Sequence, residues 1–273
     1  MSYAAIMVHF DAGPSAHRRL QLAVDLANRF QAALIGISGK SYLPTFVPDG
    51  LTAGEDAGGE RREMMNIVAD IGAEFRASAK HAKDVEWRGR AEHVNDLVSN
   101  AARAADLVII AQESEFDDEL HYKLDPGIVI LSAGRPVLVV PDDVDSLAAQ
   151  RIVLAWKDTR ESRRAVRDAL PFLKEARGVM LAEISERRTE SQSRSHLDDA
   201  ANYLLRHGIN VEAQAYLRTE STVAGELLRF AADRKADLIV AGGYGHTRLG
   251  EWMFGGVTRD LLAESRICCL FSH

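Results

Sequence analysis

The chain of 273 residues has few cysteines, no long apolar run and no excess of positive charge. Its two cysteines, Cys268 and Cys269, are adjacent, and neighbouring residues on a strand point to opposite faces, so no disulfide between them is expected. A chain with two cysteines and no expected disulfide is predicted to reside in a reducing compartment. No apolar run approaches the ~20 residues that cross a membrane. The N-terminus lacks a basic segment followed by an apolar stretch, so no signal peptide is expected. These absences predict a soluble cytoplasmic protein with no membrane partner.

Negative charge prevails over the whole chain but is divided unequally along it. The formal net charge is −7, with 47% hydrophobic and 27% charged residues. Residues 1–145 carry a net charge of −9, and residues 146–273 carry +2. A net negative charge argues against general binding to the phosphate backbone of nucleic acids. The composition therefore predicts a globular protein without a nucleic acid partner.

The sequence repeats itself at an offset of about 131 residues. Residues 106–111 read Asp-Leu-Val-Ile-Ile-Ala, and residues 237–242 read Asp-Leu-Ile-Val-Ala-Gly. Short runs of this kind, rich in β-branched residues, are typical of buried parallel strands. Two further pairs of runs match: 136–140 with 268–271 at nearly the same offset, and 6–10 with 152–156 at the start of each half. The repeat predicts two domains, 1–145 and 146–273.

Amphipathic helices alternate with these strands, which predicts in each half a parallel sheet covered by helices on both faces. In the second half we expect strands near 151–156, 179–184, 211–217, 237–242 and 267–271. The helices are expected near 160–176, 193–207, 221–235 and 256–265. The first half should follow the same order, with a long helix near 60–81 and a surface loop at the Gly- and Pro-containing insertion near 39–59.

A glycine pattern follows the fourth strand of the second half. The spacing is Gly242-x2-Gly245-x9-Gly255, with Gly256 directly after it. Glycines let the backbone approach a ligand closely, and the free N–H groups at a helix start attract phosphate. A plain tight turn accounts for the same glycines equally well, because tight turns also require glycine.

This pattern and the repeat resemble the universal stress protein family, with two copies of its domain in tandem. ATP-binding members of that family carry Gly-x2-Gly-x9-Gly followed by Ser or Thr. The resemblance implies an α/β fold of two Rossmann-like domains, of the adenine nucleotide alpha hydrolase type. Each domain would be a five-stranded parallel sheet of order 3-2-1-4-5 flanked by helices. The two would pack on one another as an internal pseudo-dimer.

The resemblance also implies a site for ATP or another adenine nucleotide in the second half only. The residues that it places there are Ala155, Trp156, Lys157, Ala241, Gly242, Gly245, His246, Arg248, Gly255, Gly256 and Val257. Two positions depart from the family pattern: Lys157 replaces an Asp, and Gly256 replaces the Ser or Thr. Thr258 offers a hydroxyl nearby, but helix geometry is expected to point it elsewhere. Whether Lys157 pairs with phosphate and Trp156 fills an adenine pocket, or both simply pack at the surface, stays open.

The first half departs further from the family pattern. Asp11 keeps the Asp at the end of the first strand, but no Gly-x2-Gly follows residue 110, and Lys123 stands where the last glycine should fall. The segment between them, Glu113 to Glu119, holds five carboxylates in seven residues and would repel a polyphosphate. We therefore expect no ATP in this half. A solvated acidic loop is favoured over a divalent cation site, and no metal is predicted.

The sequence leaves three functional interpretations open. The first is a non-enzymatic stress-response regulator that senses an adenine nucleotide. The second is a low-turnover nucleotide hydrolase, or an enzyme acting on a phosphorylated metabolite, with Asp158 or Asp260 as its carboxylate. The third is a ligand-free interaction module. The sequence has no Gly-x-Ser-x-Gly, His-Glu-x-x-His or Gly-x4-Gly-Lys-Ser/Thr motif and no kinase motifs, so none of these favours an enzyme. A monomer and a further symmetric homodimer both fit a chain that already contains two domains.

Overall fold

A computed structural model of the chain describes residues 2–40, 57–112, 123–185, 190–217, 219, 222–245 and 256–273. Three of the expected site residues, His246, Arg248 and Gly255, lie outside these ranges. So do the acidic segment 113–119 and most of the insertion near 39–59. The predictions made for these residues stay predictions.

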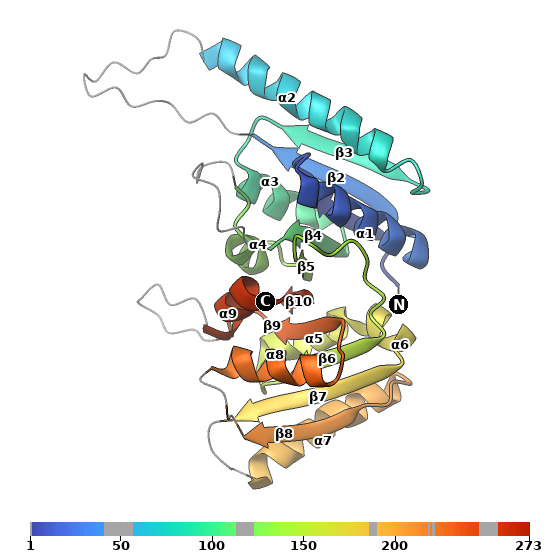
Figure 1. Cartoon of the computed structure of the whole chain (residues 1–273), viewed down its shortest axis with the longest axis vertical. Helices are drawn as coiled ribbons and strands as arrows, with labels where there is room; N and C mark the ends of the chain where they lie inside the picture. The colour runs from blue at the N-terminus through green and yellow to red at the C-terminus, as the bar shows by residue number, and fades with distance from the viewer. Residues whose placement is uncertain are drawn as a thin grey trace, which may run out of the picture.

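Strands and helices alternate along both halves of the chain (Figure 1). The elements of the first half are β1 (Ala5–His9), α1 (Pro14–Phe30), β2 (Ala33–Gly39), α2 (Ala57–Ser78), β3 (Val85–Arg90), α3 (Val94–Ala101), the short 3-10 helix η1 (Ala102–Ala104), β4 (Leu107–Ala111), α4 (Pro126–Ser132) and β5 (Val137–Val140). Those of the second half are β6 (Arg151–Ala155), α5 (Arg160–Asp168), α6 (Leu170–Glu175), β7 (Gly178–Ser185), α7 (Glu190–Arg206), β8 (Glu212–Leu217), α8 (Val223–Asp233), β9 (Leu238–Gly242), α9 (Gly256–Glu264) and β10 (Cys268–Ser272).

The single helix expected at 160–176 is instead two helices, α5 and α6, which meet at Ala169. Pro171 lies in the first turn of α6. A proline has no backbone N–H and its ring clashes with the preceding turn, so it is tolerated at the start of a helix and interrupts a longer one. The expectation of one continuous helix was wrong for this reason.

The ten strands of the described ranges form one sheet, in the order β3-β2-β1-β4-β5-β10-β9-β6-β7-β8. Within each half the strands are parallel and follow the order 3-2-1-4-5, as predicted. The halves join through their fifth strands, where β5 and β10 pair antiparallel and Leu270 lies opposite Leu138. This arrangement is the predicted pseudo-dimer within one chain.

Helices cover both faces of the sheet and enclose two apolar cores. One core takes residues from α1, α2, α5, α6 and α7, and the other from α3, α4, α8 and α9.

Cys268 lies in the first core and Cys269 in the second, so the two thiols point to opposite faces and are free. Burial raises the pKa of Cys268 far above its ordinary value and that of Cys269 to about 12. Both cysteines therefore act as buried apolar residues.

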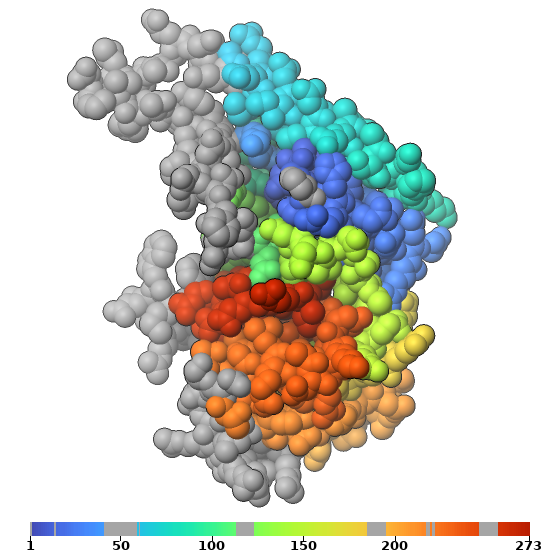
Figure 2. Space-filling model, in the orientation of Figure 1, coloured from blue at the N-terminus to red at the C-terminus, as the bar shows by residue number. Residues whose placement is uncertain are grey.

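Side chains from the two halves also pack together beside the sheet, and the space-filling view shows the C-terminal segment lying between the halves (Figure 2). Tyr3 and Phe30 of the first half contact Phe172 of α6, with ring centroids 5.5 and 5.3 Å from it. Arg29 pairs with Glu175 at 2.6 Å. The predicted domain boundary at 145/146 falls in the connection between β5 and β6, and it stays a prediction. Within the described ranges, no helix is both long and apolar enough to span a membrane.

Candidate functional site

The strand order of the second half reverses between β6 and β9. From β6 the chain continues to β7 on one side, while β9 pairs with β6 on the other. In open α/β sheets, ligands bind beyond the carboxyl ends of the strands at such a switch point. Ala155 and Ala241 lie opposite each other at this end of the pair. The sequence-predicted site therefore coincides with the place where the fold favours a ligand.

The structure brings most of the described candidates to this end of the sheet. Ala155, Trp156 and Lys157 end or follow β6, while Ala241, Gly242 and Gly245 end or follow β9. Gly256 and Val257 open α9, whose Thr258 is hydrogen-bonded to the glycine loop. Ala155, Ala241 and Val257 pack on the same face of the sheet, in the core lined by α8 and α9.

Trp156 points to the opposite face. Its side chain is 8% exposed and lies in the core with Leu197 of α7. Its indole N–H donates to Nδ1 of His196 at 3.3 Å, and Nε2 of His196 lies 3.6 Å from Oε1 of Glu183. These contacts account for Trp156 by packing and hydrogen bonding, and leave Ala155 as the β6 residue on the face of Ala241.

The first two glycines of the loop are explained in part by the helix that packs on β9. A Cβ atom on Gly242 would lie 2.7 Å from the backbone nitrogen of Ser162 and 2.9 Å from the carbonyl carbon of Glu161. These are backbone atoms of α5, which cannot move away cheaply. A Cβ atom on Gly245 would lie 3.2 Å from Oε2 of Glu161. Close packing against α5 thus requires glycine at 242 whether or not a ligand binds.

Glu161 is a site residue that the sequence reasoning missed. It is buried, at 3% exposure, in the first turn of α5, and its carboxylate pairs with Arg160. Burial alone would raise its pKa, but hydrogen bonds from Arg160, its own backbone and Thr159 bring the pKa below the ordinary value. A charged carboxylate therefore lies beside Gly245. Thr159, which caps α5, marks this turn in the sequence, since acidic residues favour the first turn of a helix.

The hydroxyl of Thr258 points into the glycine loop, contrary to expectation. It is buried, and its Oγ1 accepts a hydrogen bond from the Tyr244 N–H at 3.2 Å. The Gly243 N–H donates to the carbonyl of Ser272 at 2.8 Å. Within the described residues, the Gly245 N–H has no hydrogen-bond partner. The Gly245 N–H and the first N–H groups of α9 are therefore the described backbone donors here that could bind an anion.

In the first half, the residue after the first strand, Asp11, forms an ion pair within the same half. The Asp11 carboxylate accepts from Nη2 of Arg19 at 3.2 Å, and Nε of Arg19 donates to the His9 carbonyl at 3.0 Å. Arg19 is 1% exposed. Burial lowers the pKa of His9 to about 4, so its ring is neutral at pH 7. The Asp11 carboxylate is therefore already paired with Arg19. That this half binds no ATP stays a prediction.

The two carboxylates suggested for a hydrolase are both in ion pairs. Asp158 pairs with Arg163 at 2.8 Å, and Asp260 pairs with Arg259 at 3.1 Å. Among the residues that the structure describes, no group of three or more His, Cys, Asp or Glu side chains could hold a metal ion. The geometry thus gives the hydrolase interpretation no specific support.

Residues 148–271 match the model of the universal stress protein family. This part of the chain belongs to that family. A universal stress protein from Archaeoglobus fulgidus DSM 4304 superimposes with a TM-score of 0.75 at 15% identity, over 98% of this chain and 97% of that one. A putative universal stress protein from Pseudomonas aeruginosa UCBPP-PA14 aligns with a TM-score of 0.60 at 15% identity, over 98% and 92% of the two chains. These full-length matches confirm the fold predicted for a tandem universal stress protein.

A universal stress protein solved in complex with cAMP aligns with 52% of this chain and all of its own length, at 18% identity and a TM-score of 0.36. Among curated proteins, no sequence match was found. The family model thus covers the second half of the chain, and the full-length structural matches show the fold alone.

Proposed function

We propose that this protein is a universal stress protein that acts in a stress response by sensing an adenine nucleotide, which binds in the second half at the carboxyl ends of β6 and β9. The observation that carries the proposal is the pairing of Ala155 with Ala241 at the switch point, next to the Gly242–Gly245 turn. Two small residues there place little side-chain bulk on this face of the sheet. The start of α9 offers N–H groups to an anion.

The charges around the turn favour a nucleotide with little phosphate. Glu161 is buried and anionic beside Gly245, where a polyphosphate chain would meet it, and its ion-pair partner, Arg160, is already engaged with it. Repulsion between like charges is strong where water is excluded. Adenine would pack against the apolar face formed by Ala155, Ala241 and Val257. AMP and cyclic AMP are therefore expected to bind more tightly than ATP.

The loop also contacts the first half, which supplies a route for a regulatory response. A Cβ atom on Gly127 of α4 would lie 2.6 Å from the Tyr244 hydroxyl, and one on Gly243 would lie 2.6 Å from Cγ2 of Ile130. A ligand that holds the loop in one arrangement would bias the packing of α4 against it. That is a population shift, in which the ligand favours the arrangement that binds it better.

Calorimetric titration of the full chain with AMP, cyclic AMP, ADP and ATP tests the proposal. AMP or cyclic AMP should bind at least about tenfold more tightly than ATP. Glu161→Gln should improve ATP binding much more than AMP binding, because it removes a negative charge at nearly constant size. Glu264→Gln, at the exposed end of α9, removes the same charge away from the turn and should change neither. No binding of any of the four at millimolar concentration would overturn the proposal.

A further inference from the structure

The outermost strand of the first half, β3, has one edge that pairs with no other described strand (Figure 1). The carbonyl groups of Asp84 and Arg90 accept hydrogen bonds from the β2 side, at 2.8 and 3.2 Å. Because backbone groups alternate in direction along a strand, the N–H and C=O groups of Val85, Trp87 and Gly89 point to the open edge. These groups have no hydrogen-bond partner among the described residues. The edge can therefore accept another strand.

The charges of β3 reverse in sign about its centre. Residues 84–90 read Asp-Val-Glu-Trp-Arg-Gly-Arg, so two acidic residues precede Trp87 and two arginines follow it at mirrored positions. Side chains alternate between the faces of a strand, which places all of these charged residues on one face. On the other face, the Trp87 ring packs against Phe75 of α2, with 5.1 Å between the ring centroids. A strand with this order is complementary to an antiparallel copy of itself.

We infer that β3 pairs antiparallel with β3 of a second copy of this chain, about a two-fold axis at Trp87. Glu86 then lies opposite the partner's Arg88, and Asp84 lies opposite the partner's Arg90. Each ion pair occurs twice, because the axis repeats it. The outward groups of Trp87 bond to those of the partner's Trp87, so the charged residues fall at the non-hydrogen-bonded positions. Side chains of opposite strands approach most closely there.

The neighbouring registers match the charges less well. An axis at Glu86 would place this residue opposite its own copy, and an axis at Arg88 would do the same for that arginine. Like charges directly opposite each other destabilise an antiparallel pair. Glu86 and Arg88 also form an ion pair within the strand, with Oε1 of Glu86 2.7 Å from Nε of Arg88. Both side chains thus already lie together on the shared face, and pairing with a second copy extends this ion pair into a network.

The helix that covers β3 presents small and apolar side chains to the second copy. Glu74 of α2 pairs with His17 of α1 at 2.9 Å, which fixes the side of α2 that faces α1. Helical spacing places Met65, Ala69 and Ala73 on the opposite side, which is the side of the open edge. All three are exposed, Met65 by 41%. Small side chains let the α2 helices of the two copies lie side by side, and Met65 then packs against the partner helix.

The opposite edge of the sheet, β8, serves as an internal comparison. Asp237 accepts hydrogen bonds from the backbone at the start of β6, as Asp106 does at the start of β1. From these starts, equal steps along the strand registers bring Glu212 of β8 into correspondence with Glu86 of β3. Gln214 is therefore the counterpart of Arg88.

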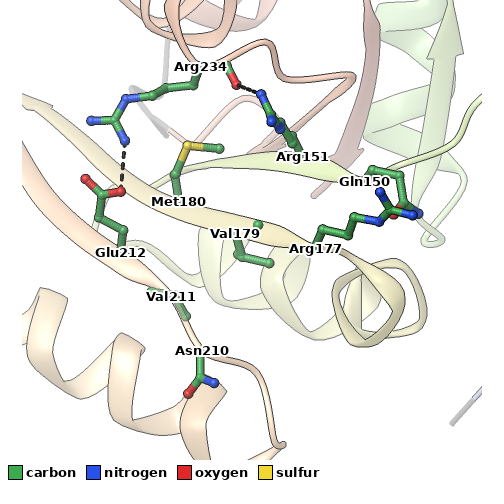
Figure 3. A pocket seen from close by; sticks show the side chains of 10 residues that line it. Gln150, Arg151, Arg177, Val179, Met180, Asn210, Val211, Glu212 and Arg234 are labelled. Carbon is green, nitrogen blue, oxygen red and sulfur yellow. Dashed lines mark hydrogen bonds and ion pairs between the residues drawn. The ribbon is translucent and has the colours of Figure 1, made fainter.

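The mirrored charges are missing from β8. Glu212 is joined to Arg234 at 2.8 Å (Figure 3), and residues 212–217 contain no arginine or lysine. Two copies of β8 would therefore form no ion pairs across the edge. One self-complementary edge in each chain closes a two-fold dimer, whereas two such edges would build an open filament. The dimer does not involve the glycine loop and does not depend on the nucleotide proposal.

Sedimentation velocity of the full chain across a concentration series, combined with amide hydrogen exchange, tests this interface. The species at high concentration should have twice the mass of one chain. Amide exchange at Val85, Trp87 and Gly89 should slow as the concentration rises, because these N–H groups become hydrogen-bonded in the dimer. A chain that stays monomeric at about 0.1 mM would overturn the proposal. So would a dimer in which these three amides exchange as fast as in the monomer.

Charge reversal distinguishes this surface from any other. Arg88→Glu with Arg90→Glu makes the charged face of β3 wholly negative and should weaken dimerisation at least about tenfold. Asp84→Arg with Glu86→Arg makes the same face wholly positive and should have the same effect. The substituted residues are exposed or half-buried, and far-UV circular dichroism verifies that each variant folds.

Restoring the complementarity should restore the dimer. A variant with all four substitutions has the mirrored order with the signs exchanged, and should dimerise again. An equimolar mixture of the two double variants should form a heterodimer, because one face is negative and the other positive. Gln214→Glu, at the β8 counterpart of Arg88, is the matched control and should leave the dimer unchanged. Undiminished dimerisation of the double variants, or a folded fourfold variant that stays monomeric, would show that β3 is not the interface.

Discussion

Gly242 illustrates how one residue can satisfy a ligand motif and a packing requirement together. The hypothetical Cβ contacts at this position are all with α5, at 2.7 to 2.9 Å. Gly242→Ala should therefore destabilise the protein by about 1–3 kcal/mol through overpacking, even with no ligand present. Urea unfolding of the ligand-free chain measures this directly.

Gly256 provides the matched control, because it directly follows the same motif but a Cβ atom there meets none of the described residues within 4 Å. The free energy of unfolding of Gly256→Ala should be unchanged or higher by up to about 1 kcal/mol, since alanine favours a helix more than glycine does. Equal stability of the two variants would mean that the close approach of α5 does not determine the glycine at 242.

At the scale of elements, the sequence predicts what depends on local pattern and misses what depends on packing between distant segments. Apolar runs and the repeat predict the strands, while their order within each half was implied by the resemblance to the universal stress protein family. Pro171 signals the break between α5 and α6 in the sequence. The apolar residues keep helical spacing on both sides of it, which favoured one continuous helix. Neither Glu161 beside Gly245 nor Thr258 against Tyr244 follows from local pattern, because each contact joins two elements across the loop.

The two aspartates that tie strand starts together offer an element-scale prediction. Asp237 joins the start of β9 to β6 by accepting two backbone N–H groups, each at 2.9 Å. Removing it leaves both donors without their partner, so Asp237→Ala should cost about 1–3 kcal/mol. Asp106→Ala should cost a similar amount in the first half. Hydrogen exchange at the first residues of β6 or β1 locates each effect.

Asp233→Ala is the comparison for that experiment, since the Asp233 side chain is 61% exposed and its ion pair is with Arg229 on its own helix. Its removal should change the free energy of unfolding by less than about 0.5 kcal/mol. A cost in Asp237→Ala no larger than this would contradict the role given to the strand-start hydrogen bonds.

Duplication gives the whole molecule a sheet with fewer exposed edge strands than two separate five-stranded units would have. Pairing of β5 with β10 removes one exposed edge from each half, and among the described strands β3 and β8 form the edges of the continuous sheet. Once joined, the two copies have been free to differ in charge. The near-neutral half contains the glycine loop, while the acidic half has no Gly-x2-Gly after residue 110.

Because one apolar core contains residues of both halves, the chain should unfold as a single cooperative unit. Phe172 is fully buried between Tyr3 and Phe30 of the other half, so Phe172→Ala should cost about 3–5 kcal/mol and should destabilise both halves together. Trp87 reports on the first half and Trp156 on the second when each is kept as the only tryptophan. Their denaturation midpoints should coincide before the substitution and fall equally after it. Midpoints that separate, with only the Trp156 signal shifted, would show instead that the halves are independent domains connected by their fifth strands.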